Sequence, residues 1–188
     1  MHIKEALNVY QPINEQELVD QKLMIRFIEN HDDYLERTNL YAHMTSSAFI
    51  LNEKMDKIVF GYHLIYDSWS WIGGHADGES DLLKVALKET KEETGLSRIY
   101  PLYDDIFSID VIYVANHIKN GHYVPDHLHL NVSYIIIADE TEALTHNDHE
   151  HLGVSWFPLD DVLSNITENR MKSVYEKAFQ KIKSLRGY

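Results

Sequence analysis

The sequence lacks cysteine altogether and has no long hydrophobic run. Without cysteine, the chain can have no disulfide bond, no thiolate zinc site and no cysteine nucleophile. The longest apolar run lies near residues 134–138, and it is far too short to cross a membrane. Residues 1–10 also lack the apolar core of a signal peptide. We therefore expect a cytoplasmic protein without a membrane partner.

Positive charge is also scarce, because 17 lysines and arginines face 30 acidic residues and the formal net charge is −13. A field of that sign repels nucleic-acid backbones, so we expect no nucleic acid polymer as a partner. The same field does not attract an acidic small molecule, so a phosphate-bearing ligand would need a metal ion as a bridge. The 12 histidines are expected to be mostly surface residues.

Length and composition favour one globular domain. The chain has 188 residues, of which 44% are hydrophobic and 25% charged, and this length is short for two domains. No internal repeat, low-complexity segment or linker divides it. We therefore expect a single domain over residues 1–188, in which residues 1–38 form an N-terminal helical extension.

The extension contains a predicted helix over residues 13–30. Asn14 is a suitable N-cap with Glu17 three positions further on, as in a capping box. An apolar stripe follows at i, i+4 spacing, formed by Val19, Leu23 and Phe27. The stripe indicates that this helix packs on the main domain. A homodimer contact is the alternative use of the same face.

Strands and further helices alternate along the rest of the chain. Alternating or continuous apolar and β-branched residues predict strands over residues 47–53, 58–66, 70–72, 106–114, 127–138 and 154–157. Segments 116–126 and 139–151 are polar and predict loops. Helical spacing predicts a helix over about 81–94 and a C-terminal helix with an apolar face formed by Met171, Val174, Tyr175, Ala178, Phe179 and Ile182. This order favours an α/β or α+β fold, with a mixed sheet between helices.

Acidic side chains cluster on the helix predicted over 81–94. Glu89, Glu92 and Glu93 are at i, i+3 and i+4, which places them on one side of a helix. Three like charges repel there, and a divalent cation would remove that cost. Carboxylate oxygens suit Mg²⁺ or Mn²⁺ better than zinc or copper. The alternative interpretation is a solvated helix surface with salt bridges, because such charge runs are common.

The surroundings of these glutamates resemble the Nudix box, G-x5-E-x7-R-E-U-x-E-E-x-G-U, in which U is a bulky apolar residue. Counted from Gly74, the matching positions are Lys88 at the arginine place, then Glu89, Thr90, Lys91, Glu92, Glu93, Thr94, Gly95 and Leu96. Lysine stands for arginine at 88, threonine stands for the apolar residue at 90, and the upstream glutamate is Glu79, one place early. A later segment, residues 156–160, resembles the WFPLDEL-type segment of many Nudix proteins.

This resemblance implies a Nudix α/β/α sandwich that hydrolyses a nucleoside diphosphate linked to another group, with Mg²⁺ or Mn²⁺ as the cofactor. It implies that Glu89, Glu92 and Glu93 bind the metal with help from the Gly74 carbonyl. Lys88 and Glu79 would then orient the site.

The general base and the substrate contacts are less defined. The resemblance allows a box glutamate, here Glu92, or a glutamate on a later loop. Glu150 is the preferred loop residue and Glu142 the other. His127 and His129 share one face of their strand and could touch the substrate, although a polar strand face explains them equally well.

Other functions remain compatible with the sequence. A Nudix-fold isomerase would rely on a cysteine, which the chain lacks. A non-catalytic Nudix-fold module that senses a nucleotide or sugar nucleotide is the main alternative, and an interaction domain with an acidic helix is another. For a hydrolase, the substrate is open among ADP-ribose, sugar nucleotides, dinucleoside polyphosphates, oxidised nucleotides and coenzyme A.

Overall fold

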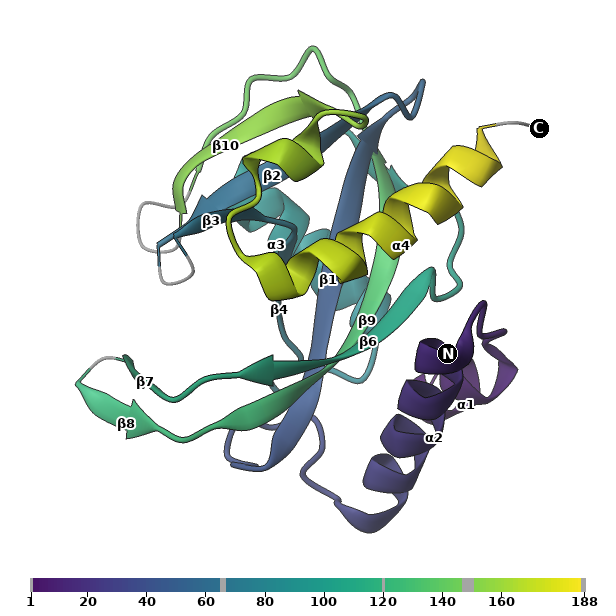
Figure 1. Ribbon diagram of the computed structural model, residues 1–188, viewed down its shortest axis with the longest axis vertical. Coiled ribbons are helices and arrows are strands. Elements are labelled where there is room, and N and C mark those ends of the chain that lie inside the picture. The colour runs from purple at the N-terminus through teal and green to yellow at the C-terminus, as the bar shows by residue number, and fades with distance from the viewer. Residues whose placement is uncertain (1, 65–66, 120, 147–150, 187–188) are drawn as a thin grey trace. The chain divides into compact units, whose positions relative to one another are not determined.

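A computed structural model describes residues 2–64, 67–119, 121–146 and 151–186 (Figure 1). The chain forms two compact units, each built from three separate segments. Unit 1 consists of Met1–Ser47, Gly73–Ala86 and Asp104–Tyr134, and unit 2 of Ala48–Ile72, Leu87–Tyr103 and Ile135–Tyr188. No helix in the described part of the chain is long and apolar enough to cross a membrane.

The described residues form helices and two sheets. The helices are α1 (Ile3–Val9), α2 (Glu15–Asn30), α3 (Leu82–Thr94), α4 (Asn169–Leu185) and the 3-10 turn Val162–Asn165. The larger sheet contains β1 (Ala42–Asn52), β2 (Lys57–His63), β3 (Ser68–Ser70), β4 (Ile72–His75), β5 (Ile99–Pro101), β6 (Ser108–Val114), β9 (His127–Ala138) and β10 (His151–Pro158). Its central order is β10-β2-β1-β9-β5, with β3 beside β2, β4 beside β1 and β6 beside β9.

Most of the predicted elements are present. Strand β9 has the predicted bounds, and α3 and α4 occupy the predicted segments. Strand β1 begins at Ala42, five residues earlier than predicted, because its polar first half is buried throughout and gives no apolar signal. The short elements α1, β5 and the 3-10 turn were not foreseen, and the strand predicted over 70–72 is divided between the end of β3 and the start of β4.

The loop predicted over 116–126 is wrong in part. Strands β7 (His117–Lys119) and β8 (His122–Val124) form an antiparallel ladder of their own, which continues from β6 and β9 (Figure 1). Gly121 has a positive φ of 79°, the conformation that favours glycine at such a turn. The polar segment is therefore a hairpin.

Polar side chains join β1 to β9 inside unit 1. Thr45 Oγ1 donates to Asn131 Oδ1 at 3.0 Å, and the Ser47 and Ser133 hydroxyls lie 2.8 Å apart. Both contacts advance by two residues in the same direction, so the two strands run parallel there. The pairs of β9 with β6 and β5 are antiparallel, as is that of β1 with β2. The sheet is therefore mixed, and the expected α+β class is confirmed.

Helix α2 begins as predicted, because the Asn14 side chain accepts a hydrogen bond from the Glu17 backbone N–H at 2.9 Å. Glu17 is fully buried, and one of its oxygens accepts from the Ile13 N–H and the Tyr10 hydroxyl. Its other oxygen accepts from the Ser108 hydroxyl at 3.2 Å. A buried carboxylate needs such donors, so Glu17 fastens α2 to β6 within unit 1.

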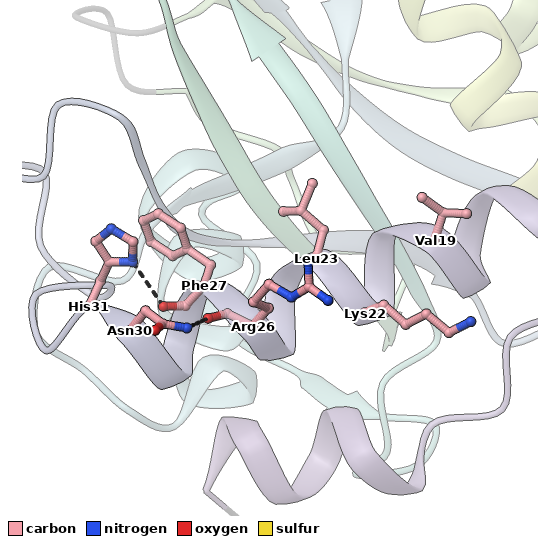
Figure 2. A pocket seen from close by; sticks show the side chains of 7 residues that line it. All are labelled: Val19, Lys22, Leu23, Arg26, Phe27, Asn30 and His31. Atoms are coloured by element: carbon pink, nitrogen blue, oxygen red, sulfur yellow. Dashed lines mark hydrogen bonds between the residues drawn. The ribbon is translucent and has the colours of Figure 1, made fainter.

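Two residues of the apolar stripe predicted to pack on the domain, Val19 and Leu23, are instead exposed, and Phe27 is only partly buried. Val19 is 55% exposed and Leu23 38%, whereas Met24 and Ile28 of the same helix are buried. Figure 2 shows the stripe with basic and polar neighbours along a groove on α2, lined by Val19, Lys22, Leu23, Arg26, Phe27, Asn30 and His31. The prediction was wrong because α2 buries the neighbouring face, which contains Glu17.

Unit 2 has an aromatic core beneath α4. Tyr175 meets Phe60 edge-on with ring centroids 5.1 Å apart, and Phe49 meets Trp71 at 5.6 Å. The predicted apolar face is confirmed for Met171, Tyr175, Ala178, Phe179 and Ile182, which are all buried.

Alkaline pH should weaken the fold through Tyr134. Burial raises the pKa of its phenol, and the carboxylates of Asp81 and Asp105 raise that pKa further. The unfolded tyrosine ionises above about pH 10 while the folded one keeps its proton, so stability falls as pH rises through that value. The loss is about 1.4 kcal/mol per pH unit. Urea unfolding of Tyr134→Phe should show a smaller loss on moving from neutral to alkaline pH.

The matched control is Tyr123→Phe, because Tyr123 is 66% exposed. On moving from neutral to alkaline pH, Tyr123→Phe should lose as much stability as the unmodified protein does. Equal alkaline losses in both variants would contradict the assignment to Tyr134.

Candidate active site

The glutamate-bearing helix α3 is fixed at both ends. Asp81 Oδ1 accepts a hydrogen bond from the Lys84 N–H at 3.2 Å, which makes Asp81 the N-cap, and Gly95 ends the helix with a φ of 72°. The buried positions are Leu82, Val85, Ala86, Thr90, Glu93 and Thr94. Leu83 and Leu87 are only partly buried.

Lys88 lies between two of the three glutamates. Its ammonium nitrogen is 3.2 Å from Glu89 Oε1 and 3.2 Å from Glu92 Oε2. Hydrogen bonds that Lys88 donates to Glu92 and Glu89 raise the pKa of Lys88. The Glu92 side chain is 57% exposed and that of Glu89 only 15%. Lys88 thus offsets the repulsion between these carboxylates and orients both.

Glu93 faces a buried histidine that the sequence interpretation missed. His151 Nδ1 lies 3.8 Å from Glu93 Oε2, and both side chains are almost fully buried. Burial, then the charges of His63 and His146, lower the pKa of His151 to about 4. The ring is therefore neutral at pH 7. His151 was overlooked because the segment before it is polar and was assigned to a loop, whereas β10 begins at this residue.

The His151 ring occupies the space above Gly61 of β2. A β-carbon at Gly61 would lie 2.5 Å from His151 Nε2 and closer still to Cδ2. Real β-carbons do not approach other atoms so closely. Glycine at position 61 is therefore what lets His151 lie beside Glu93.

Two predicted residues lie in unit 1. Glu79 accepts hydrogen bonds from the Asp81 N–H at 3.1 Å and from Lys84 Nζ at 2.5 Å, so it supports the start of α3. Gly74 lies in β4. The glutamates belong to unit 2, so the Gly74 carbonyl as a metal ligand stays a prediction from the sequence motif.

The two loop glutamates differ in what the structure describes. Glu142 accepts from the Ser97 hydroxyl at 2.6 Å and from the Arg98 N–H at 2.9 Å, and these bonds to Ser97 and Arg98 lower its pKa. Such a carboxylate is a weak base that already supports the chain after α3. Glu150, the preferred base, lies outside the described residues.

His127 and His129 lie in unit 1 within a larger group of histidines. Their Nε2 atoms are 3.3 Å apart, and His43 and His75 contribute further rings. Of the 11 described histidines, only His43, His127 and His151 are buried, so the expected surface location holds for most of them but fails for these three. The i, i+2 spacing of His43, Thr45 and Ser47 is that of one strand face. These residues are polar, however, so the first half of β1 gave no hydrophobic alternation from which a strand could be predicted.

Solved structures with a similar fold are Nudix proteins. A NUDIX-family hydrolase from Clostridium perfringens is 21% identical with a TM-score of 0.52, over 76% of this chain and 97% of that chain. An Ap4A hydrolase from C. elegans, in a binary complex, is 16% identical with a TM-score of 0.55, over 77% and 98%. The E. coli dihydroneopterin triphosphate pyrophosphohydrolase is 12% identical with a TM-score of 0.52, over 71% and 92%. These similarities show the fold of the Nudix-type hydrolases.

The family follows from the sequence itself. The NUDIX domain model matches residues 42–178, well over half of the chain. The chain therefore belongs to the NUDIX domain family, and its class is that of the Nudix-type hydrolases. The resemblance drawn from the glutamate cluster is confirmed. A comparison with curated proteins found no match.

The donor set on α3 fits the divalent metal ion that Nudix hydrolases generally use. Its three carboxylates are hard oxygen donors, and Lys88 shows that this face already attracts a cation. Among the described residues, these oxygens are not gathered at metal-binding spacing: Glu89 and Glu92 meet Lys88, while Glu93 faces His151.

Substitution of Gly61 should test the packing of His151. We expect Gly61→Ala to destabilise the protein by about 1–3 kcal/mol, because an added methyl group overpacks a filled space. Urea unfolding measures this change. Gly153→Ala is the control, because no atom lies within 4 Å of a β-carbon there.

A second substitution assigns the clash to the ring. His151→Ala in the Gly61→Ala background removes the clashing atoms, so the double variant should cost less than the sum of the two single changes. Strict additivity would show that the ring is not the obstacle.

Proposed function

We propose that the protein hydrolyses a diphosphate linkage in a nucleoside diphosphate joined to another group, with Mg²⁺ or Mn²⁺ bound by Glu89, Glu92 and Glu93. The observation that carries the proposal is the arrangement on α3. One carboxylate is buried against His151, one is partly buried, and the third is exposed beside Lys88. Membership of the NUDIX domain family supports the reaction class.

The residues of α3 would have different roles in metal binding. Burial fixes Glu93, and Lys88 holds Glu89 and Glu92 until a stronger cation competes for them. Lysine suits this exchange because its ammonium is a point charge on a flexible stem. When bound, the ion would neutralise diphosphate oxygens and lower the pKa of an attacking water. Neutral His151 beside Glu93 keeps a second positive charge away from the site.

Two residues are proposed as the general base. Glu92 is exposed and can reach a water molecule from the helix surface. Glu150 remains a candidate from the sequence alone. Glu142 is the weaker choice, because its oxygens already accept several hydrogen bonds.

Substrate contacts and partners belong to the same proposal. His127 and His129 of unit 1 are proposed to contact the substrate, and neither a nucleic acid polymer nor a membrane is proposed as a partner. The exposed groove on α2 keeps a homodimer contact among the proposals. The names of two solved relatives mention Ap4A and dihydroneopterin triphosphate, so both compounds join the substrate panel.

The decisive measurement is metal-dependent product release from a panel of nucleoside diphosphate conjugates. We expect turnover with Mg²⁺ or Mn²⁺, and we expect Glu92→Gln and Glu93→Gln to lower kcat by about 100-fold or more. Glu176→Gln is the matched control, because Glu176 is exposed on α4 and remote in sequence from the box. Its kcat should match that of the unmodified protein.

Two outcomes would overturn the proposal. Ligand binding without turnover would assign the chain to the non-catalytic sensing modules. Equal activity in the Glu92, Glu93 and Glu176 variants would show that the α3 carboxylates do not serve the reaction.

A further inference from the structure

Four histidine rings gather around one point in unit 1. The His43 ring of β1 has its centroid 5.1 Å from that of His75, 5.0 Å from His127 and 5.0 Å from His129. His75 ends β4, and the other two rings project from β9. These residues come from three segments of the chain, so the cluster is a product of the fold.

Three of these rings have the spacing of a metal site. Ligand atoms of His43, His75 and His129 all lie within 4.8 Å of one another. Nitrogens bound to one tetrahedral zinc ion lie about 3.4 Å apart, given zinc–nitrogen distances of about 2.0–2.1 Å. Small side-chain rotations would close that difference. His75 and His129 are partly exposed, so an ion can enter from solvent.

The hydrogen bonding of His43 leaves one ring nitrogen available as a metal ligand. It is 4% exposed, and its Nδ1 lies 3.2 Å from the Asn39 carbonyl oxygen, which can only accept a hydrogen bond. The proton is therefore on Nδ1, and the lone pair is on Nε2. That Nε2 is buried and receives no hydrogen bond from any described residue. Metal-bound histidines typically donate their other nitrogen to a carbonyl or carboxylate in this way.

His127 supports its neighbour rather than completing the set of three. Its Nδ1 lies 2.8 Å from the Pro125 carbonyl oxygen, so its proton is on Nδ1 and its Nε2 can accept. The His129 Nε2, 3.3 Å away, is then the donor between the two rings. This bond fixes the orientation of the His129 ring within the cluster.

Burial favours the neutral form of the His43 ring. Burial is the main cause that lowers its pKa, while the hydrogen bond to Asn39 opposes it. The nearby Arg37 and Asp77 form a bidentate ion pair with each other, with both N···O distances at 2.6 Å. The positive charge of Arg37 is thus matched by the Asp77 carboxylate.

We propose that His43, His75 and His129 form a binding site for a borderline transition-metal cation such as Zn²⁺, with ligands other than the carboxylates of α3. Imidazole nitrogens prefer zinc, nickel and copper, whereas carboxylates prefer magnesium and manganese. Three protein ligands leave a position open for water or another small ligand. As a metal ligand, His129 would take this role in place of the substrate contact proposed above, and the metal proposal does not rest on the hydrolase reaction.

The test uses the full chain, freed of metal by a chelator, and Zn²⁺ alone as the probe. Equilibrium dialysis with metal analysis should show tight uptake that excess Mg²⁺ does not displace. His43→Gln and His129→Gln should weaken the affinity for Zn²⁺ by at least about 100-fold, because loss of a mere supporting partner already costs 10–100-fold. His122→Gln, on the exposed side of β8, should leave the affinity unchanged.

Further measurements distinguish metal binding by the histidines from metal binding by the α3 glutamates. Glu92→Gln and Glu93→Gln should retain the Zn²⁺ uptake assigned to the histidines. Co²⁺ in place of Zn²⁺ should give the strong visible absorption of a nitrogen site with few ligands, and His43→Gln should lose it. His75→Gln provides a second variant at a partly exposed position, in case the buried His43 change disturbs folding, which urea unfolding would reveal.

Three results would overturn the site. The first is Zn²⁺ affinity that is unchanged in the His43, His75 and His129 variants. The second is loss of uptake only in the glutamate variants. The third is binding of inorganic phosphate, but not Zn²⁺, by the metal-free chain, which would assign the cluster to anion binding by protonated histidines.

Discussion

The polar contact between β1 and β9 is the constraint on which unit 1 depends. Both strands are buried along most of their length, so their polar side chains must find partners within the protein. Asn131 does so by donating to Ser47 and Ser133 and accepting from Thr45. These bonds fix the register, since a shift by one residue would turn every side chain to the opposite face.

The same register explains why histidines meet. Side chains two residues apart in a strand share a face, so His43 continues the row of Thr45 and Ser47. His129 likewise continues the row of Asn131 and Ser133. The bonds that pair the rows therefore bring the two rings to 5.0 Å. Along the same polar row, the residues inside the sheet pair the two strands, and the histidines that continue the row form a cluster of potential metal ligands.

Helix α3 follows a different principle, because its charged face is set by helical periodicity alone. The three glutamates were assigned from sequence, and the structure adds the surroundings of each one. Lys88 holds Glu89 and Glu92, while Glu93 is buried against His151. The position of His151 in turn requires glycine at 61, which belongs to a different strand. The sequence motif therefore describes the ligands but not the packing that holds them.

Local patterns were enough to predict α3, α4, β9 and membership of the NUDIX domain family, because periodicity, caps and the spacing of the box are properties of neighbouring residues. The same reasoning misjudged the stripe of Val19, Leu23 and Phe27, since two faces of α2 were suitable for burial and the Glu17 carboxylate decided between them. Tertiary structure alone determined the histidine cluster and the contact of His151 with Glu93. Their members come from chain segments tens of residues apart, and only strand pairing and the packing of α3, which no local pattern encodes, place these segments in contact.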